Sequence, residues 1–146
     1  MLKKFVLLGL FLSLFCSIAQ ASVQKVAVVD VQKVVNKSSQ VQALKKEQAA
    51  KQKELAAFIK KAGEDIKNQP DAEKKKTVAQ KYEKELKAKQ ESYAKAYKAK
   101  LVTIDKSISD TITQQAKIMG YDLVLTTGVV LYGGEDITDA IIKVVK

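Results

Sequence analysis

The chain has 146 residues, which supports one modest domain. All its basic residues are lysine, its formal net charge is +10, and it contains no histidine, arginine or tryptophan. The single cysteine, Cys16, lies in the N-terminal apolar stretch, so the rest of the chain can form neither a disulfide nor a thiolate metal site. Most catalytic chemistries therefore lack their usual side chains, and we expect no enzyme function.

The first 21 residues have the layout of a secretory signal peptide. Lys3 and Lys4 form a positive n-region, residues 5–18 form an apolar core, and residues 19–21 form an A-x-A site. We expect cleavage after Ala21, with an uncleaved membrane anchor as the alternative, although the apolar run is short for a span. Export without disulfides fits a bacterial periplasm. Loss of the two lysines would leave a net charge of +8.

The next segment predicts a short buried strand followed by a short helix. Residues 23–30 hold four valines and one alanine, which is typical of a strand with little solvent contact. Asp30 can end this strand and cap the helix, in which Val31, Val34 and Val35 share one face.

Residues 38–119 predict one long helical hairpin that turns at residues 68–71. Pro70 is the only proline, and it falls where the apolar rhythm of the segment breaks. Its polar neighbours favour a turn. The alternative is a mild kink in one continuous helix of about 80 residues.

Each predicted arm carries a narrow apolar stripe. In the outgoing arm the stripe is interrupted between Leu44 and Leu55, at Gln48 and at Lys51 or Gln52. In the returning arm the stripe is more regular, and it is aliphatic from Leu101 onward. We therefore expect a well-packed base and a looser tip.

The last part of the chain predicts two strands and a helix. Gly120 occupies the position of a left-handed helix cap. Residues 121–126 predict a strand, residues 127–128 a turn and residues 129–132 a second strand, which together would form a β-hairpin. We expect Asp136 to cap the final helix.

These elements predict an α+β fold in which a small β-body carries a long protruding α-helical hairpin. The single mature domain would span residues 22–146, with residues 22–37 and 120–146 forming the body. About 40 residues in three short strands and two small helices are too few for a stable core of their own. We therefore expect oligomerisation to complete the body, with a plain intramolecular core as the alternative. The expected oligomer-interface residues are Val26, Val28, Leu123, Leu125, Val129 and Leu131.

The sequence carries no recognisable catalytic or metal-binding motif. The pair Gly133 and Gly134 lacks the spacing of a phosphate-binding loop, and there is no EF-hand spacing among the carboxylates. Most carboxylates lie one helical turn from a lysine, as expected for a solvated helix face. We expect no metal site and no cofactor.

Both ends of the chain resemble the Skp/OmpH family of periplasmic chaperones. Residues 25–30 (KVAVVD) resemble the opening strand of the family. Residues 121–125 (YDLVL), the segment up to Tyr132 and residues 136–138 (DIT) resemble its C-terminal signature. The lysine-rich arms match the family in character, and the specific motifs cover about 35 residues.

The resemblance implies a homotrimer whose strands form a central body and whose three hairpins enclose a cavity. Such a protein holds unfolded outer-membrane proteins in the periplasm without ATP. A basic cavity would attract acidic unfolded chains, and scattered apolar residues would add many weak contacts. The arms are shorter than expected of the best-known member of the family, which implies a smaller cavity. The sequence has no arginine to match the lipopolysaccharide-binding positions of the family. The expectation that lipopolysaccharide or anionic lipid is a partner therefore depends on charge alone.

Six apolar and aromatic arm residues are candidates for client contact, and the alternative is that they pack the two arms together. These residues are Phe58, Ile59, Ile66, Tyr82, Tyr93 and Tyr97. An alternative function is an envelope coiled-coil protein that binds polyanions or anionic membrane surfaces. It explains the charge and the helices but gives no reason for the return of the chain to the sheet. Nucleic acid is not an expected partner in the cell, because the export signal directs the protein away from the chromosome.

Overall fold

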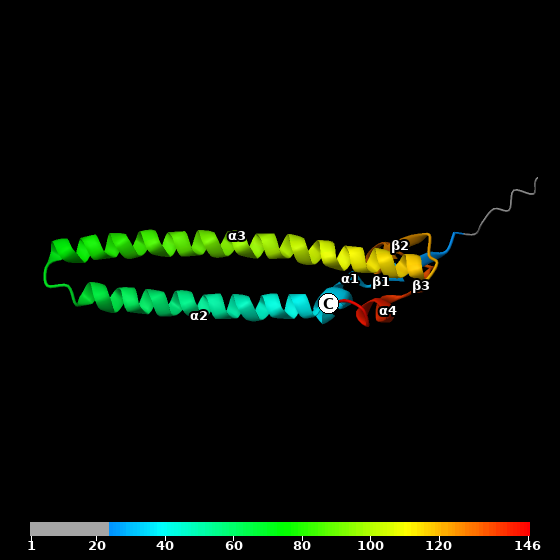
Figure 1. Cartoon of the computed structure of the whole chain (residues 1–146), viewed down its shortest axis with the longest axis horizontal. Coiled ribbons are helices and arrows are strands. Elements are labelled where there is room, and N and C mark those ends of the chain that lie inside the picture. The colour runs from blue at the N-terminus through cyan, green and yellow to red at the C-terminus, as the bar shows by residue number, and fades with distance from the viewer. Residues whose placement is uncertain (1–23) are drawn as a thin grey trace, which may run out of the picture.

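The computed structural model describes residues 24–146, so the predicted signal peptide and its cleavage site lie outside the described residues. Two long helices lie side by side and extend from a small body of strands and short helices (Figure 1). This arrangement confirms the predicted α+β fold with a long helical hairpin. The elements are β1 (Val26–Val29), α1 (Val31–Lys37), α2 (Ser39–Lys67), α3 (Ala72–Ile118), β2 (Leu123–Thr126), the 3₁₀ helix η1 (Thr127–Val129), β3 (Glu135–Asp136) and α4 (Thr138–Ile142).

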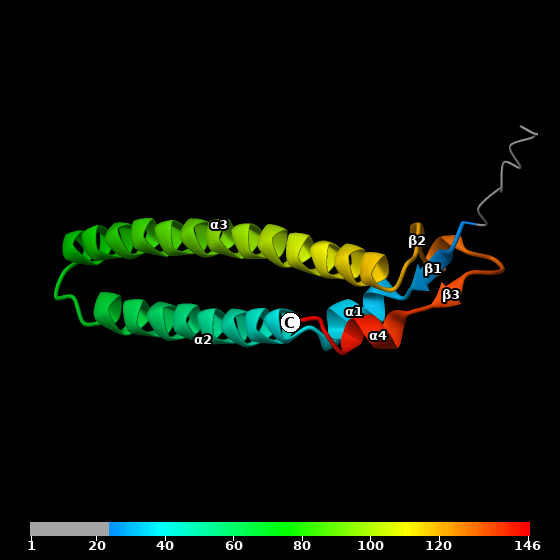
Figure 2. The same ribbon diagram turned by 45° about the vertical axis from the view of Figure 1, so that its right-hand side comes forward.

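The three strands form one parallel sheet in the order β2-β1-β3. The whole helical hairpin is the crossover between β1 and β2, and the view in Figure 2 shows the sheet at one end of the molecule. Val26 pairs with Leu123 and Val28 with Leu125, so these four side chains share one face of the sheet. We call this face, which is opposite the helices, the outer sheet face.

The predicted β-hairpin over residues 121–132 is wrong. The chain turns into η1 after β2, and the third strand comes later, at Glu135 and Asp136. Since β2 and β3 both run parallel to β1, a tight two-residue turn cannot connect them. Residues 129–132 have the β-branched and apolar composition of a strand, but among the described residues they pair with no strand.

Polar side chains cap the helices where the sequence places them. The carboxylate of Asp30 accepts a hydrogen bond from the backbone N–H of Lys33 at 2.9 Å, and Ser38 Oγ accepts one from Val41 at 3.3 Å. The helices α2 and α3 are joined at residues 68–71, where Asp71 accepts a hydrogen bond from the Lys74 N–H at 2.7 Å. Each cap satisfies an N–H group that the first helical turn leaves free.

The expectation that Asp136 is the N-cap of the last helix is wrong by one residue. Asp136 belongs to β3, and Ile137 occupies the N-cap position of α4. The carboxylate of Asp136 still accepts hydrogen bonds from the backbone N–H and the hydroxyl of Thr138, and these bonds hold its pKa below the ordinary value. The sequence therefore identified the capping carboxylate but missed the short strand that contains it.

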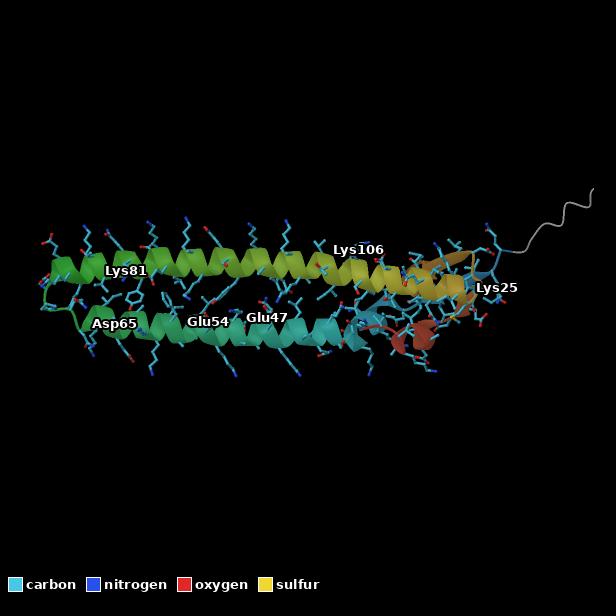
Figure 3. The ribbon with its side chains drawn as sticks, viewed as in Figure 1. Lys25, Glu47, Glu54, Asp65, Lys81 and Lys106 are labelled. Atoms are coloured by element: carbon cyan, nitrogen blue, oxygen red, sulfur yellow. The ribbon has the colours of Figure 1, made fainter. Side chains whose placement is uncertain are left out.

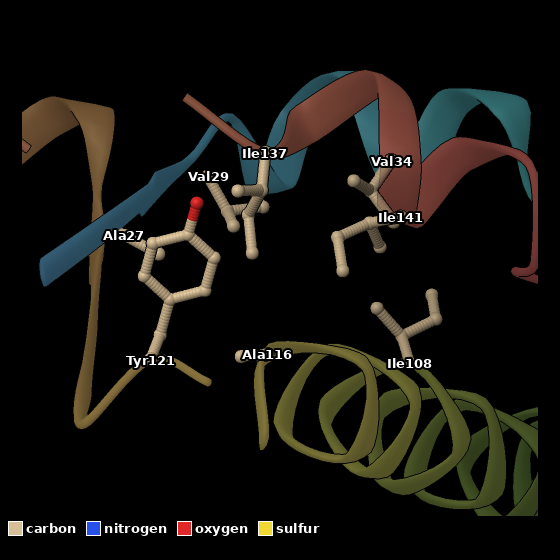
Figure 4. Packing of buried hydrophobic residues seen from close by; sticks show 8 residues of the cluster. All are labelled: Ala27, Val29, Val34, Ile108, Ala116, Tyr121, Ile137 and Ile141. Atoms are coloured by element: carbon tan, nitrogen blue, oxygen red, sulfur yellow. The ribbon is translucent and has the colours of Figure 1, made fainter. Parts of the chain in front are cut away.

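The core lies between the helix-facing side of the sheet and the helices α1, α3 and α4. Figure 4 shows Val29 of β1, Val34 of α1, Ile108 of α3 and Ile141 of α4 converging, with the ring of Tyr121 beside β1. Val29, Val34 and Ile141 are all at most 1% exposed. This core fixes the angle at which the arms leave the sheet, because α3 takes part both in the core and in the hairpin.

Gly120 ends α3 in the left-handed conformation that only glycine adopts without strain. Its φ is +79°, and the N–H groups of Gly120 and Tyr121 bond the carbonyls of Lys117 and Ala116, both at 3.0 Å. This pattern of 6→1 and 5→2 hydrogen bonds is the Schellman motif. It turns the chain directly into the strand β2, as the sequence predicts.

Two glycine substitutions should therefore have opposite effects on stability. Gly120→Ala is expected to lower the free energy of unfolding by about 1 kcal/mol through backbone strain alone, since a Cβ there meets nothing within 4 Å. Gly63→Ala, inside α2 and equally unobstructed, is expected to raise it by about 0.5–1 kcal/mol. Urea unfolding of both variants measures the difference. A loss of stability in both variants would contradict this account.

Candidate functional site

Within residues 24–146, all of the net charge lies in the arms. Residues 38–119 contain 19 lysines and 11 acidic residues, a net charge of +8. The described body, residues 24–37 and 120–146, contains five lysines and five acidic residues and is neutral. Figure 3 shows long side chains projecting from both arms along their whole length. An anionic chain in solution is therefore attracted to the arms rather than to the body.

Three polar bridges join the arms. The carboxylates of Glu47, Glu54 and Asp65 on α2, labelled in Figure 3, bond Lys100, Tyr93 and Tyr82 on α3, in that order. In each pair the two residue numbers add up to 147, so all three bridges share one register. Each carboxylate comes from α2 and each donor from α3, so a slip of one residue would break all three bonds together.

The middle bridge is the most elaborate of the three. Besides the hydrogen bond from Tyr93, Glu54 accepts one from Lys51 Nζ at 3.0 Å and lies 3.5 Å from Lys89 Nζ. Lys51 also lies 4.4 Å from the centroid of the Tyr93 ring. The hydrogen bond from the tyrosine hydroxyl, followed by that from Lys51, lowers the pKa of Glu54 from 4.5 to about 2.

The pKa of Glu54 predicts a pH dependence of stability. Because the folded pKa lies below the ordinary value, the bridge contributes its full stability above pH 4.5 and loses it as the pH falls towards 2. The midpoint of thermal unfolding of Glu54→Gln should lie below that of the wild type at pH 7, and the difference should shrink below pH 4.5. Glu91→Gln is the control, since Glu91 makes no ion pair within residues 24–146. A difference that is constant from pH 7 to 3 would contradict the assignment.

The structure brings four of the six candidate client-contact residues together near the tip. Phe58, Ile59, Ile66 and Tyr82 line one shallow hollow of about 280 Å³ between the arms. The rings of Phe58 and Tyr82 meet edge to face, with centroids 5.4 Å apart. Ile59 is 53% exposed, whereas the two rings are half-buried. Ile59 is thus the most accessible side chain of this group.

The other two candidates lie farther down the arms and differ in their surroundings. Tyr93 is half-buried and is held by the middle bridge. Tyr97 is 38% exposed and lines a larger groove of about 530 Å³ at the base of the arms. We call this the base groove. Its walls come mainly from Val41 and Leu44 on α2 and from Tyr97, Leu101 and Ile104 on α3.

The expected interface residues occupy the outer sheet face and the segment that follows it. Val28 is buried, because Gly134 lies so close that a Cβ there would come within 2.5 Å of its side chain. Leu123 remains 42% exposed, and Val129 and Leu131 are largely or fully exposed. Val26 and Leu125 are half-buried. Among the described residues of one chain, this end of the molecule therefore presents uncovered apolar surface.

Neither a metal site nor a membrane span is visible in residues 24–146. No three His, Cys, Asp or Glu side chains of this part lie where they could hold a metal ion. No helix of the same range is both long and apolar enough to cross a bilayer.

Sequence reasoning missed the carboxylates of the three bridges. The signal was present, since Glu47, Glu54 and Asp65 are spaced by 7 and 11 residues, as are Lys100, Tyr93 and Tyr82 in reverse order. The three carboxylates fall outside the apolar stripe on which a helix-pairing prediction depends. Only a comparison of polar spacings on both arms would have found them.

The sequence matches the family described as "Outer membrane protein (OmpH-like)" over residues 25–145, which covers both the body and the arms. The chain belongs to the OmpH-like family. A search of the curated proteins finds no match. Membership of the family indicates a periplasmic chaperone of outer-membrane proteins rather than an enzyme. The long arms with dispersed apolar patches and a net positive charge are consistent with this assignment.

Proposed function

We propose that this OmpH-like protein is an ATP-independent holdase that binds unfolded outer-membrane proteins in the periplasm and prevents their aggregation in transit. The observation that carries the proposal is that the excess charge and the apolar hollows lie together on the arms. Within residues 24–146, the arms hold all the excess charge and two apolar hollows, whereas the body is neutral. Long-range attraction would gather an acidic client, and several weak apolar contacts would retain it.

For client contact we favour Ile59, Tyr97 and Ile66, whose side chains have no role in the inter-arm bridges. Phe58, Tyr82 and Tyr93 belong to contacts between the arms, so a client would reach only their exposed edges. Tyrosine and phenylalanine still offer apolar surface at the edge of such a contact.

The proposal includes a homotrimer assembled through the outer sheet face and residues 129–132. Val130 has extended backbone angles, with φ −102° and ψ 118°, which are compatible with pairing to a strand of another subunit. The edge strands β2 and β3 each leave one side unpaired within residues 24–146. Closed cyclic symmetry would cover both the edges and the apolar face. The proposed mature chain begins at Ser22, which the mass of the exported protein would test.

Dilution of an unfolded β-barrel protein tests the holdase function. Urea-unfolded outer-membrane protein is diluted into buffer with and without the mature protein, and turbidity is followed at low and moderate salt. We expect aggregation to be suppressed at about one assembly per client, with suppression retained at moderate salt. If the protein fails to suppress aggregation at every ratio of protein to client, the proposed holdase function is rejected.

The alternative is an envelope protein that binds polyanions or anionic membrane surfaces through its lysines. Binding of that kind would weaken steeply with ionic strength, because it depends on the release of counterions. A client complex that dissociates completely at moderate salt would favour this alternative. Lipopolysaccharide or anionic lipid would then be tested directly with vesicles.

A further inference from the structure

The base groove lies where the apolar stripe of α2 is interrupted. Gln48 and Gln52 occupy positions at which apolar side chains would otherwise complete the contact with α3. Opposite them, Leu101 remains 43% exposed although it belongs to the apolar stripe of α3. The base of the hairpin therefore keeps accessible apolar surface beside its packed core.

The groove also contains polar side chains without partners in the described chain. Gln48, Gln52, Asp105 and Ser109 line it, and none of their side chains makes a hydrogen bond or an ion pair within residues 24–146. Two amides, a carboxylate and a hydroxyl offer both donors and acceptors. The groove thus combines apolar walls with uncommitted hydrogen-bonding groups.

We propose that the base groove binds an extended segment of an unfolded outer-membrane protein whose apolar side chains occur at every second residue. This inference rests on the proposed holdase function. The N–H and C=O groups of an extended segment need partners, which the two amides, Asp105 and Ser109 can supply. A helical segment bonds its own backbone, so its apolar face would bury these polar groups unsatisfied.

The dimensions of the groove fit a short extended segment. From Val41 to Gln52 the groove follows α2 over 11 residues, about 16 Å, which an extended chain covers with about five residues. The side chains on one face of such a segment are about 6.6 Å apart. The wall residues Tyr97, Leu101 and Ile104 follow one another at intervals of four and three residues, about 6 and 4.5 Å along the helix axis, so the gaps between them come close to this spacing.

Charge decides what the remaining side chains of the bound segment should be. They would point out of the groove into the positive potential around the arms, which carry a net charge of +8; the groove itself is lined by Lys45 and Asp105. Acidic or neutral polar residues are therefore favoured between the apolar ones. Strands of outer-membrane barrels have this alternation of apolar and polar residues.

Two labelled peptides of identical composition test the proposal. One alternates apolar and acidic or polar residues, and the other places the same apolar residues at helical spacing. Fluorescence anisotropy with the wild-type mature protein at moderate salt should show at least fivefold tighter binding of the alternating peptide. Leu101→Gln should weaken that binding about tenfold, as expected for the loss of one buried leucine contact. The control Val102→Gln alters a neighbouring side chain that is 64% exposed and does not line the groove, so it should change affinity less than twofold.

A variant that adds apolar surface distinguishes binding in the groove from nonspecific binding to exposed apolar side chains. Ala49→Phe, on the α2 side of the groove, fills space that the peptide would occupy and should also weaken binding. Circular dichroism confirms that each variant remains folded. Tighter binding to Ala49→Phe, equal binding of the two peptides, or equal effects of Leu101→Gln and Val102→Gln would overturn the proposal. If the wild type still suppressed client aggregation in those cases, the holdase would stand and only the groove would be rejected.

Discussion

Replacing Ile141 by alanine is expected to lower the free energy of unfolding by about 2–4 kcal/mol. Ile141 is fully buried on α4 and lies in the cluster that joins the sheet to the arms. Removal of three carbons there leaves a cavity beside Val34 and Ile108, which the close-packed surroundings fill only in part. Urea unfolding followed by circular dichroism measures the change.

The matched control for this variant is Ile118→Ala near the end of α3. Ile118 is 78% exposed, so the same change in side chain should alter stability by less than about 0.5 kcal/mol. A loss at Ile141 no greater than that at Ile118 would mean that the arms fold independently of the body core. In the expected case the arms and the body lose structure together, because α3 runs through both.

The helical hairpin could be predicted because its signals are local. A 3.6-residue apolar period, the only proline and the capping residues Ser38 and Asp71 all act within a few residues of the chain. The left-handed cap at Gly120 is local in the same sense. These features specify the arms before any tertiary contact forms.

The pairing of the strands could not be predicted in the same way. Residues 129–132 have strand composition, yet in the single chain the third strand is the acidic pair Glu135 and Asp136. That pair joins β1 because the positive φ of Gly134 and its close approach to Val28 bring the chain alongside the sheet. Contacts between distant segments decide which segment pairs with β1, and the strand propensity of a segment gives little information about such contacts.

The candidate site was partly visible in the sequence. The interruption at Gln48 and at Lys51 or Gln52 was recognisable as a gap in a stripe, and the base groove, which Gln48 and Gln52 line, opens at the same place. Whether such a gap becomes a groove depends on the register of the arms, which the three polar bridges set. A single helix pattern carries no information about that register.

A double variant in the exposed segment after β2 tests the assembly on which a three-armed cavity depends. Val129→Lys with Leu131→Lys is expected to convert the proposed trimer into monomers. Both side chains are largely or fully exposed in one chain, so the change should leave the fold of the monomer intact. Burial of each side chain in an interface is worth about 1.5–3 kcal/mol, so losing both weakens association by roughly 100-fold to 10,000-fold.

Native mass and aggregation suppression, measured on the same sample, separate assembly from client binding. Val102→Lys adds a lysine to an exposed arm position and controls for charge, and it should keep the native mass of the wild type. The double variant should lose most of its suppression, because one hairpin alone offers too few weak contacts to retain a client. An unchanged native mass would place the interface elsewhere. A monomer that still suppresses aggregation fully would show that each hairpin acts alone. The base groove of a single chain would then be the main client contact, rather than one of three equivalent grooves in a trimer.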